Sequence, residues 1–318
     1  MDAAAIADRF ALGTRAALSD GPAARGKQGA VWRLTTTDGR WAVKVPFRPD
    51  DEQALRPAAV FQEAAAAAGV PAPRIRRTPE GDLFAVVDGV QLRVHEWVDH
   101  ADPDPLLDPE LVGAAVAATH RVPGAEPAAP FTDVDRWYLD PVGAPRWDRL
   151  IDELDAEGAP FAPKLAALRD ELVGLESWLT PPAAPRTCHR DLVAANLVPT
   201  ASGGVCIIDW ENSGPADASQ ELGFVLFEFG RTDPGRARAL AAAYADAGGP
   251  GRVTGPGDFS MLIAVLGHIT ELAAGDWLRP NDRSPSRAHA EEWIDEALDD
   301  PHTRDRLGGL LAGITQRG

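Results

Sequence analysis

Two acidic residues and an amide occur in this chain at a spacing that suits the handling of phosphate. The run His189-Arg190-Asp191-Leu192-Val193-Ala194-Ala195-Asn196 places Asp191 five residues before Asn196, and Asp209 follows after another thirteen. One carboxylate can orient an attacking hydroxyl and accept its proton, while carboxylate and carboxamide oxygens can hold the magnesium ions that bridge phosphates. The chemistry that this set predicts is phosphoryl transfer.

The octet agrees with the H-R-D-L-x-x-x-N loop of kinases at every fixed position. One loop would present Asp191, the proton acceptor, at its start and Asn196, a metal ligand, at its end. Asp209, the second metal ligand, would arrive from the β-branched run at residues 205–208. The alternative is an ordinary turn followed by an unrelated aspartate at the end of a strand. The full match of the octet favours the kinase interpretation.

A lysine and a glutamate upstream could complete a nucleotide site. Lys44 lies in the alternating segment Trp41-Ala42-Val43-Lys44-Val45, which resembles the V-A-I-K strand of kinases and could bring its ammonium group to the phosphates. Glu63 follows nineteen residues later, and we expect it to pair with Lys44 and hold it in position. Each residue alone would be interpreted as a surface charge. Their position ahead of Asp191 favours a shared site for ATP and Mg²⁺.

A turn with two glycines precedes this lysine. Gly26 and Gly29 form a G-x-x-G pattern between two predicted strands, with Lys27 and Gln28 between them. Backbone N–H groups in such a turn can cover phosphates. The corresponding loop of protein kinases has three glycines. A nucleotide lid and an ordinary hairpin turn therefore both stay open for this segment.

The first part of the chain reads as antiparallel sheet. Thr-Thr-Asp-Gly separates strand-like residues 29–34 and 41–47, and Asp88-Gly89 separates residues 83–87 and 91–94. Asp-Gly is a preferred pair in tight hairpin turns, so both segments predict β-hairpins. Between them, the residues over 51–68 predict a helix with Val60, Ala64 and Ala67 on one face.

The later part of the chain reads as mainly helical, apart from the compact passage at residues 186–209. The pattern change divides the chain into an N-terminal nucleotide-binding lobe over residues 1–97 and a helical lobe over residues 98–318, which would hold the catalytic loop and the acceptor pocket. The predicted helices of the second lobe span residues 109–121, 163–179, 219–229, 234–247, 259–274 and 286–298.

Charge and composition narrow the range of partners. The 318 residues include 48 acidic and 31 basic side chains, a formal charge of −17 that repels nucleic-acid phosphates and anionic membrane surfaces. The same charge would favour cationic small molecules, although it would also serve solubility alone. Cys188 and Cys206 have no metal-type spacing, and neither a leader segment nor an uninterrupted apolar run of about 18 residues is found. We expect a reduced, cytoplasmic protein that binds neither nucleic acid nor membranes.

With these residues assembled, the chain resembles the aminoglycoside phosphotransferase and choline kinase family, a small-molecule branch of the protein-kinase-like fold. Ile207-Ile208-Asp209-Trp210-Glu211 is similar to the family's metal-binding strand end, where Trp commonly follows the aspartate. Residues 214–222 resemble its Gly-Asp-Pro-x-x-x-Asp-Leu segment, with Glu221 in place of the structural aspartate. Ala118-Thr119-His120 resembles a helix end whose histidine is structural. The resemblance implies an α+β, bilobal fold with a small antiparallel-sheet N-terminal lobe and a larger, mainly helical C-terminal lobe.

One residue departs from this family. Arg190 stands where the family usually has glycine, and it brings the loop closer to protein kinases. A protein kinase would also have a cation shortly after Asp191, an Asp-Phe-Gly and a long activation segment closed by Ala-Pro-Glu. Here Val193-Ala194-Ala195 has no cation, and Trp210-Glu211 follows the aspartate. The small-molecule branch is favoured.

The resemblance also implies binding surfaces on both lobes. Residues 94–98 should form the hinge between lobes, with backbone groups around Glu96 and Val98 that bind adenine. The acceptor pocket should lie among the later helices, and its candidate residues are Glu271, Asp276, Trp277 and Glu292, with Glu291 and Asp295 also nearby. An aromatic and acidic wall would suit a sugar or an ammonium group.

The expected function is ATP- and Mg²⁺-dependent transfer of the γ-phosphoryl group to a hydroxyl of a small molecule. An aminoglycoside, an amino sugar or a similar cationic or sugar-like compound is the expected acceptor, and antibiotic resistance would be one role. A kinase-fold module that binds nucleotide without transfer is the alternative, and a protein kinase is a more distant one. The acceptor itself, the choice between ATP and GTP and the oligomeric state stay open.

Overall fold

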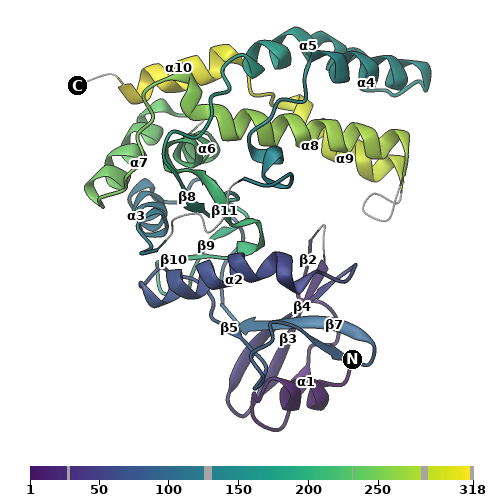
Figure 1. Cartoon of the computed structure of the whole chain (residues 1–318), viewed down its shortest axis with the longest axis vertical. Coiled ribbons are helices and arrows are strands. Elements are labelled where there is room, and N and C mark those ends of the chain that lie inside the picture. Colours follow the sequence, from purple (N-terminus) through teal and green to yellow (C-terminus); the bar gives the residue numbers. More distant parts are fainter. Residues whose placement is uncertain (27–28, 125–130, 231, 281–285, 316–318) are drawn as a thin grey trace. The chain divides into compact units, whose positions relative to one another are not determined.

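The computed structural model describes residues 1–26, 29–124, 131–230, 232–280 and 286–315 (Figure 1). The chain forms two compact units. The first consists of Met1–Asp104, Val122–Gly124 and Ala194–Ser213, and the second of Pro105–Arg121, Ala125–Val193 and Gly214–Gly318. Two stretches of the predicted helical lobe, Val122–Gly124 and Ala194–Ser213, thus fold with the N-terminal unit, and the main boundary lies after Asp104 instead of residue 97.

The first unit is built on an antiparallel sheet. Its central path runs β1-β3-β4-β7-β5, with β2 paired to β3 and β6 paired to β7. Both predicted hairpins are confirmed, and in the second one Asp88 and Gly89 adopt the positive φ angles that a tight turn of this kind needs. The strands are β1 (Ala17–Leu18), β2 (Ala24–Arg25), β3 (Gly29–Thr36), β4 (Gly39–Pro46), β5 (Ile75–Arg76), β6 (Ala85–Val87) and β7 (Val90–Glu96).

Apolar side chains on β3, β4 and β7 form the core of this sheet. Leu34, Val43, Leu92 and Val94 are fully buried, and Ile6 of α1 (Ala3–Arg9) packs against them. Alternate residues of a strand point to opposite faces, so these positions leave Lys44 and Arg93 on the other face. The hydrophobic pattern of the strands thereby decides which side chains can reach a site.

Helix α2 (Glu52–Ala67) begins at Asp51, whose side chain accepts a hydrogen bond from the N–H of Gln53 at 2.9 Å. The predicted helix is therefore present, and its buried face differs from the face that carries Val60, Ala64 and Ala67. Val60 is 54% exposed, whereas Ala58, Phe61 and Ala65 are buried. The buried residues are spaced three and four apart, and they turn the neighbouring Glu63 toward the edge of the sheet.

A small hairpin completes the first unit. Strands β9 (Leu197–Pro199) and β10 (Val205–Ile207) are antiparallel, and Ile207 N–H donates to the carbonyl of Pro71 at 2.7 Å. The short 3₁₀ helix η2 (Trp210–Asn212) follows, and the ring of Trp210 packs 5.6 Å from that of Phe61 in α2. This packing holds the residues after β10 against the same helix that covers the sheet.

The second unit is mainly helical, as predicted. Its β8 (Pro185–Cys188) and β11 (Gly214–Asp217) form an antiparallel pair, in which Cys188 lies opposite Gly214. The helices include two that the sequence did not indicate, α4 and α10. They are α3 (Pro109–His120), η1 (Asp135–Tyr138), α4 (Ala144–Ala156), α5 (Ala162–Glu176), α6 (Ala218–Gly230), α7 (Pro234–Asp246), η3 (Pro256–Phe259), α8 (Ser260–Leu278), α9 (Arg287–Asp299) and α10 (Arg304–Thr315).

A cluster of aromatic and aliphatic side chains from α4, α5, α8 and α9 forms a core of this unit. Trp147, Leu150 and Leu165 are fully buried in it. Within the described residues one helical stretch, Pro256–Leu278, is long and apolar enough to cross a membrane. Because 61% of its apolar window is buried inside the protein, packing accounts for this composition. The α+β fold class, with its antiparallel sheet followed by a helical region, is confirmed.

Candidate active site

Two cations and two carboxylates meet on one face of the sheet in the first unit. Lys44 in β4 lies opposite Arg93 in β7. The ammonium group of Lys44 donates to Oδ1 of Asp209 at 2.5 Å and to Oε1 of Glu211 at 2.6 Å, and Arg93 forms an ion pair with the same oxygen of Glu211. Lys44 and Asp209, 165 residues apart in sequence, are thereby brought into direct contact.

The backbone turn after β10 determines the direction in which the carboxylates of Asp209 and Glu211 point. Asp209 adopts a left-handed conformation with φ 65° and ψ 56°, which non-glycine residues rarely use. The turn separates the buried strand residue Ile207 from the exposed Asp209, whose side chain is 49% exposed. An unusual conformation of this kind at a charged residue is typical of a functional site.

Close packing of the charges shifts their acidity. Although half of its side chain is exposed, the partial burial of the Asp209 carboxyl group and the neighbouring Glu211 carboxylate raise the pKa of Asp209 to about 6, and Lys44 opposes this shift. Burial alone would also raise the pKa of Glu211, but Lys44 and Arg93 hold that pKa well below its usual range. The two acidic groups keep the pKa of Lys44 raised despite its desolvation. Lys44 is therefore a cation and Glu211 an anion across the physiological range.

Asn196 lies at the same end of the β9–β10 hairpin as Asp209. Leu197 pairs with Ile207, and the carbonyl of Asn196 accepts a hydrogen bond from Ile208 N–H at 2.8 Å, one residue before Asp209. Carboxylate and carboxamide oxygens are the donors that Mg²⁺ prefers, so the two residues fit a magnesium site in chemical type. Asn196 itself is buried, and its carbonyl bond fixes the base of the hairpin.

Asp191 belongs to the second unit, where it is half-buried in the loop after β8. The backbone of the two preceding residues is held by one buried carboxylate. Arg190 N–H donates to Oε1 of Glu221, and His189 N–H donates to Oε2 at 3.3 Å. Arg190 has a φ of 66°, so the loop turns sharply just before Asp191. Glu221 thus determines where the predicted base is presented.

Glu221 is in turn oriented by a buried hydrogen-bond chain. Its Oε2 lies 2.7 Å from Nε2 of His120, whose Nδ1 lies 2.8 Å from the hydroxyl of Tyr244. That hydroxyl also accepts a hydrogen bond from Gly251 N–H at 2.9 Å. Although burial opposes it, His120 and the loop amides keep the pKa of Glu221 lowered. Glu221 is fully buried and charged, which is tolerable because its oxygens are paired.

His120, Cys188 and Glu221 also form the one trio among the described residues with a spacing that a metal ion could use. The oxygens of Glu221 already bond to two backbone amides and to His120, and burial raises the pKa of the Cys188 thiol well above its ordinary value. A metal would need the thiolate and would break the contacts that hold the loop. The hydrogen-bonded arrangement explains the trio without a metal.

A second buried ion pair holds the side chain of Arg190. Its guanidinium donates to Oδ1 of Asp135 at 2.5 Å and lies 4.0 Å from the ring centre of Tyr138 in η1. A Cβ on Gly214 would come within 2.5 Å of this guanidinium, so glycine is needed beside it. Sequence reasoning missed Asp135 and Tyr138. The signal that could have pointed to them was Arg190 itself, a cation where the resembling family has glycine, since a buried cation requires a partner.

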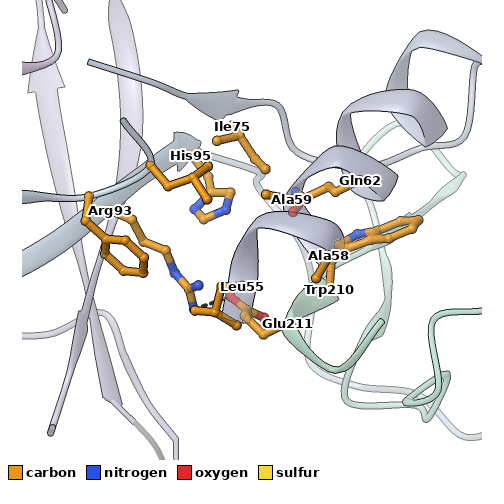
Figure 2. Close-up of a pocket in the computed structure, with 11 residues that line it drawn as sticks. Leu55, Ala58, Ala59, Gln62, Ile75, Arg93, His95, Trp210 and Glu211 are labelled. Carbon is orange, nitrogen blue, oxygen red and sulfur yellow. Dashed lines mark ion pairs between the residues drawn. The ribbon is translucent and has the colours of Figure 1, made fainter. Parts of the chain in front are cut away.

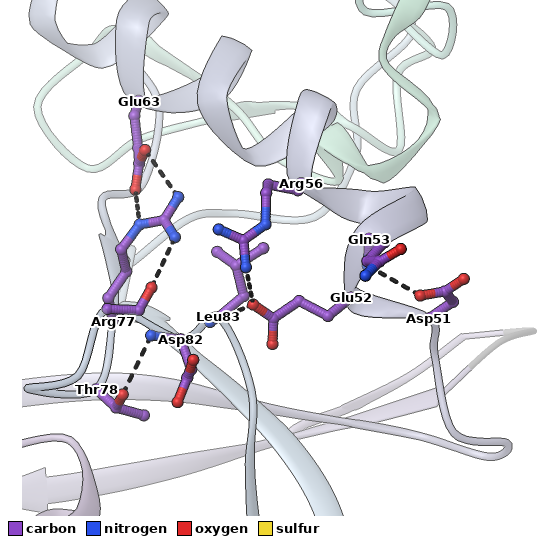
Figure 3. A network of polar contacts seen from close by, with 10 residues as sticks. Asp51, Glu52, Gln53, Arg56, Glu63, Arg77, Thr78, Asp82 and Leu83 are labelled. Atoms are coloured by element: carbon purple, nitrogen blue, oxygen red, sulfur yellow. Dashed lines mark hydrogen bonds and ion pairs between the residues drawn. The ribbon is translucent and has the colours of Figure 1, made fainter.

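The expected pairing of Glu63 with Lys44 does not occur. The two carboxylate oxygens of Glu63 instead accept hydrogen bonds from Nε and Nη2 of Arg77, at 2.7 and 3.1 Å. Figure 3 shows this contact. The reason is geometric: α2 buries its Phe61 face, which directs Glu63 to Arg77 beyond β5. Lys44 instead finds its carboxylates on the segment that follows β10, at Asp209 and Glu211.

The glycine turn lies partly outside the described residues, which exclude Lys27 and Gln28. Gly26 N–H donates to the carbonyl of Gly29 at 3.0 Å. A Cβ on Gly29 would come within 2.5 Å of the carbonyl oxygen of Val45, whereas Gly26 has open space around it. Close strand packing thus accounts for Gly29, and a phosphate-binding role of this turn stays a prediction.

The predicted adenine-binding segment ends β7. Glu96 N–H donates to the carbonyl of Arg74 at 2.8 Å, and Trp97 N–H donates to that of Arg40 at 3.0 Å. A recess of about 290 Å³ is lined here by Glu96, Trp97 and Val98, by residues 38–41 at the β3–β4 turn and the start of β4, and by residues 72–73. The N–H of Glu96 is therefore engaged within the sheet edge, while Val98 faces the recess.

The candidate acceptor residues occupy different environments. Arg146 donates to Glu271 at 2.6 Å, and His268 adds a second contact at 3.4 Å. The side chain of Trp277 is 3% exposed and donates its indole N–H to Glu291 at 2.8 Å, so Trp277 belongs to the core instead of an open wall. Asp276 is buried beside it, and Glu292 is exposed on α9. The structure does not gather these four side chains around one cavity within the described part of the second unit.

Comparisons with known proteins support the fold and the family. A profile described as Phosphotransferase enzyme family matches residues 22–255. Spectinomycin phosphotransferase, solved with ADP and spectinomycin, is 13% identical, with a TM-score of 0.64 and coverage of 94% of this chain and 92% of that one.

Two further solved structures have the same fold. An aminoglycoside phosphotransferase from Alicyclobacillus acidocaldarius is 16% identical, with a TM-score of 0.60 and coverage of 96% and 93%. A choline/ethanolamine kinase family protein from Mesorhizobium loti is 19% identical, with a TM-score of 0.50 and coverage of 92% and 93%. No curated protein matches the sequence. At these identities the solved structures show the fold, whereas the profile spans most of the chain and includes Lys44, Asp191, Asn196 and Asp209: the chain belongs to the phosphotransferase enzyme family.

Proposed function

We propose that this small-molecule kinase transfers the γ-phosphoryl group of ATP to a hydroxyl group of its acceptor. The observation that carries the proposal is the contact between Lys44 Nζ and Asp209 Oδ1 at 2.5 Å. It joins a cation suited to nucleotide phosphates with a carboxylate suited to a metal ion, in an unusual backbone conformation. Such a pair has no evident value for stability alone, because half of the Asp209 side chain is exposed to solvent.

Each residue has a distinct part in the proposed reaction. Lys44 would bind phosphate oxygens, and Asn196 and Asp209 would hold Mg²⁺, which neutralises phosphate charge when bound. Asp191 would accept the proton of the acceptor hydroxyl as its oxygen bonds to the γ-phosphorus and the bond to the β–γ bridging oxygen breaks, releasing ADP. The sharp turn at Arg190 and the grip of Glu221 on the loop backbone would fix Asp191 for this step.

A cationic or sugar-like alcohol is the acceptor class that we propose. The formal charge of −17 favours the approach of cations. Solved proteins of similar fold include kinases of spectinomycin, ethanolamine and amicoumacin. Glu271 is a weak candidate for binding an ammonium group, because Arg146 already neutralises its charge. The side chain of Glu292 is exposed on α9, so a ligand could reach its carboxylate.

The test is a screen of ADP release over aminoglycosides, amino sugars, macrolides and amino alcohols, with Mg²⁺ present and then chelated. Products would be identified by mass spectrometry and ³¹P NMR. We expect one acceptor class to be phosphorylated on a hydroxyl only when Mg²⁺ is present. Nucleotide binding without transfer to any acceptor would contradict the proposal and favour a regulatory module.

A further inference from the structure

The nucleotide-facing lysine has an unexpected partner in this chain. Lys44 bonds to Oε1 of Glu211 at 2.6 Å, although α2 carries Glu63 at the position where a partner was expected. Glu63 is occupied by a two-pronged contact with Arg77, whose third donor, Nη1, bonds to the carbonyl of Gly81 at 3.0 Å (Figure 3). Moving Glu63 to Lys44 would leave the Arg77 guanidinium without its carboxylate, so the exchange is costly.

Glu211 is well placed to hold Lys44. It accepts from Lys44 of β4 and from Arg93 of β7, which lie opposite each other in the sheet. The side chains of Glu211 and Arg93 are only 17% and 15% exposed, and Arg93 lies over the ring of Phe84 at 5.7 Å. An ion pair shielded from water in this way keeps a defined geometry, unlike an exposed pair.

Building on the proposed function, we propose that Glu211, two residues after the metal-binding Asp209, is the positioning residue for Lys44, and that Arg93 anchors Glu211. Asp209 would turn to Mg²⁺ when the nucleotide binds, whereas Glu211 would stay with Lys44 and direct its ammonium group to the phosphates. In this chain the carboxylate that holds Lys44 therefore comes from the turn after β10 and not from helix α2. A shift of α2 would then leave the geometry of Lys44 unchanged.

The far side of Glu211 borders a small cavity between α2 and β7 (Figure 2). Its volume is about 20 Å³, and its walls are largely apolar, with Leu55, Ala59 and Ile75 among them. Glu211, Arg93 and His95 also line it, and each has one buried atom without a hydrogen-bond partner within the described residues: Glu211 Oε2, Arg93 Nε and His95 Nδ1. A cavity of this size with three polar atoms suits one ordered water. The proposal therefore includes one water that completes the bonding of Glu211.

The deciding experiment measures ADP affinity by isothermal titration calorimetry on the full chain with EDTA present, so that metal binding by Asp209 does not contribute. Three single variants are compared with the wild type: Glu211→Gln, Glu63→Gln and, as a matched control on α2, Glu52→Gln. We expect Glu211→Gln to weaken ADP binding by about tenfold or more, and the other two by less than about twofold. Weaker binding in Glu63→Gln than in Glu211→Gln would overturn the inference.

A second set of measurements separates positioning from folding. Glu211→Asp keeps the charge but shortens the reach by one methylene, and we expect it to weaken ADP binding even if Glu211→Gln does not fold. In turnover assays, the KM for ATP should rise in these variants while the KM for the acceptor stays unchanged. Glu211 variants with wild-type ADP affinity would overturn the inference but leave the proposed function intact. A wild-type protein that binds no nucleotide would overturn both.

The water has its own test in a high-resolution crystal structure. We expect one density peak within hydrogen-bond distance of Glu211 Oε2 and His95 Nδ1. An empty cavity in well-ordered density would overturn this part of the proposal.

Discussion

The guanidinium of Arg190 donates to Oδ1 of Asp135 at 2.5 Å, and both side chains are 6% exposed. Arg190 immediately precedes the predicted base Asp191, and its own backbone is in a left-handed conformation. The pair therefore ties the catalytic loop to η1, a short element 55 residues earlier in the chain. Removal of one partner of such a pair leaves a buried charge without compensation.

Replacement of Asp135 by Asn should damage both stability and turnover. We expect a loss of about 3 to 5 kcal/mol in the free energy of unfolding, measured by urea denaturation, because the Arg190 charge stays buried. We expect a larger fold-change in kcat than in the KM for ATP, because Arg190, which loses its partner, directly precedes Asp191. Asp133→Asn is the control, because the side chain of Asp133 is fully exposed. Wild-type stability of Asp135→Asn would contradict the buried ion pair.

Gly214→Ala tests the same pair from the opposite side. A Cβ at this position would come within 2.5 Å of the guanidinium carbon, and Arg190 cannot move away without loss of Asp135. We expect a thermal midpoint several degrees below that of the wild type and reduced kcat. Gly275→Ala in α8, where a Cβ meets nothing within 4 Å, should be neutral or slightly stabilising. Equal behaviour of the two variants would argue against close packing at Gly214.

Glu221→Ala should disorder the catalytic loop. The carboxylate accepts from the N–H groups of His189 and Arg190 and from His120, and its loss leaves these buried donors unpaired. We expect a cost of about 3 kcal/mol or more in unfolding free energy and faster hydrogen exchange at the two loop amides. Mass spectrometry of exchanged peptides would detect this change. Unaltered protection of residues 189–190 would show that another group holds the loop.

Acid should destabilise the protein partly through His302. This residue is 6% exposed, and burial lowers its pKa to about 4, despite the opposing charge of Glu171. Between about pH 6.5 and pH 4 the unfolded chain binds a proton that the native state does not, so stability decreases as the pH falls. The expected slope from this residue is about 1.4 kcal/mol per pH unit.

His302→Gln should remove that part of the slope when urea denaturation is repeated from pH 7 to pH 4. His289→Gln, on the exposed start of α9, is the matched control and should leave the slope unchanged. An identical pH dependence of wild type and His302→Gln would refute the assignment.

Local sequence patterns predicted which residues could carry the chemistry of the site, but they did not predict which residues contact each other there. The alternating strand around Lys44, the octet ending at Asn196 and the β-branched run before Asp209 each carry their information within a few residues. These patterns sufficed to predict the hairpins and the α+β fold class. The long-range partners had no local signature.

Glu63 shows why long-range partners could not be predicted from the sequence. Its partner depends on the rotation of α2 about its own axis, and the helix buries Phe61 while Val60 stays exposed. In an alanine-rich helix many faces are similarly apolar, so a single aromatic residue decides the rotation. The Asp135–Arg190 pair was missed for a related reason, since nothing near Asp135 in sequence distinguishes it from the other aspartates of residues 133–140.

The turnover of Asp191→Asn on the acceptor found in the screen shows whether Asp191 accepts the hydroxyl proton in the phosphoryl transfer. We expect kcat to fall by about 10² to 10⁴-fold while ADP affinity stays within about twofold of the wild type. Turnover of a correctly folded Asp191→Asn enzyme at a rate close to the wild-type rate would contradict this role of Asp191.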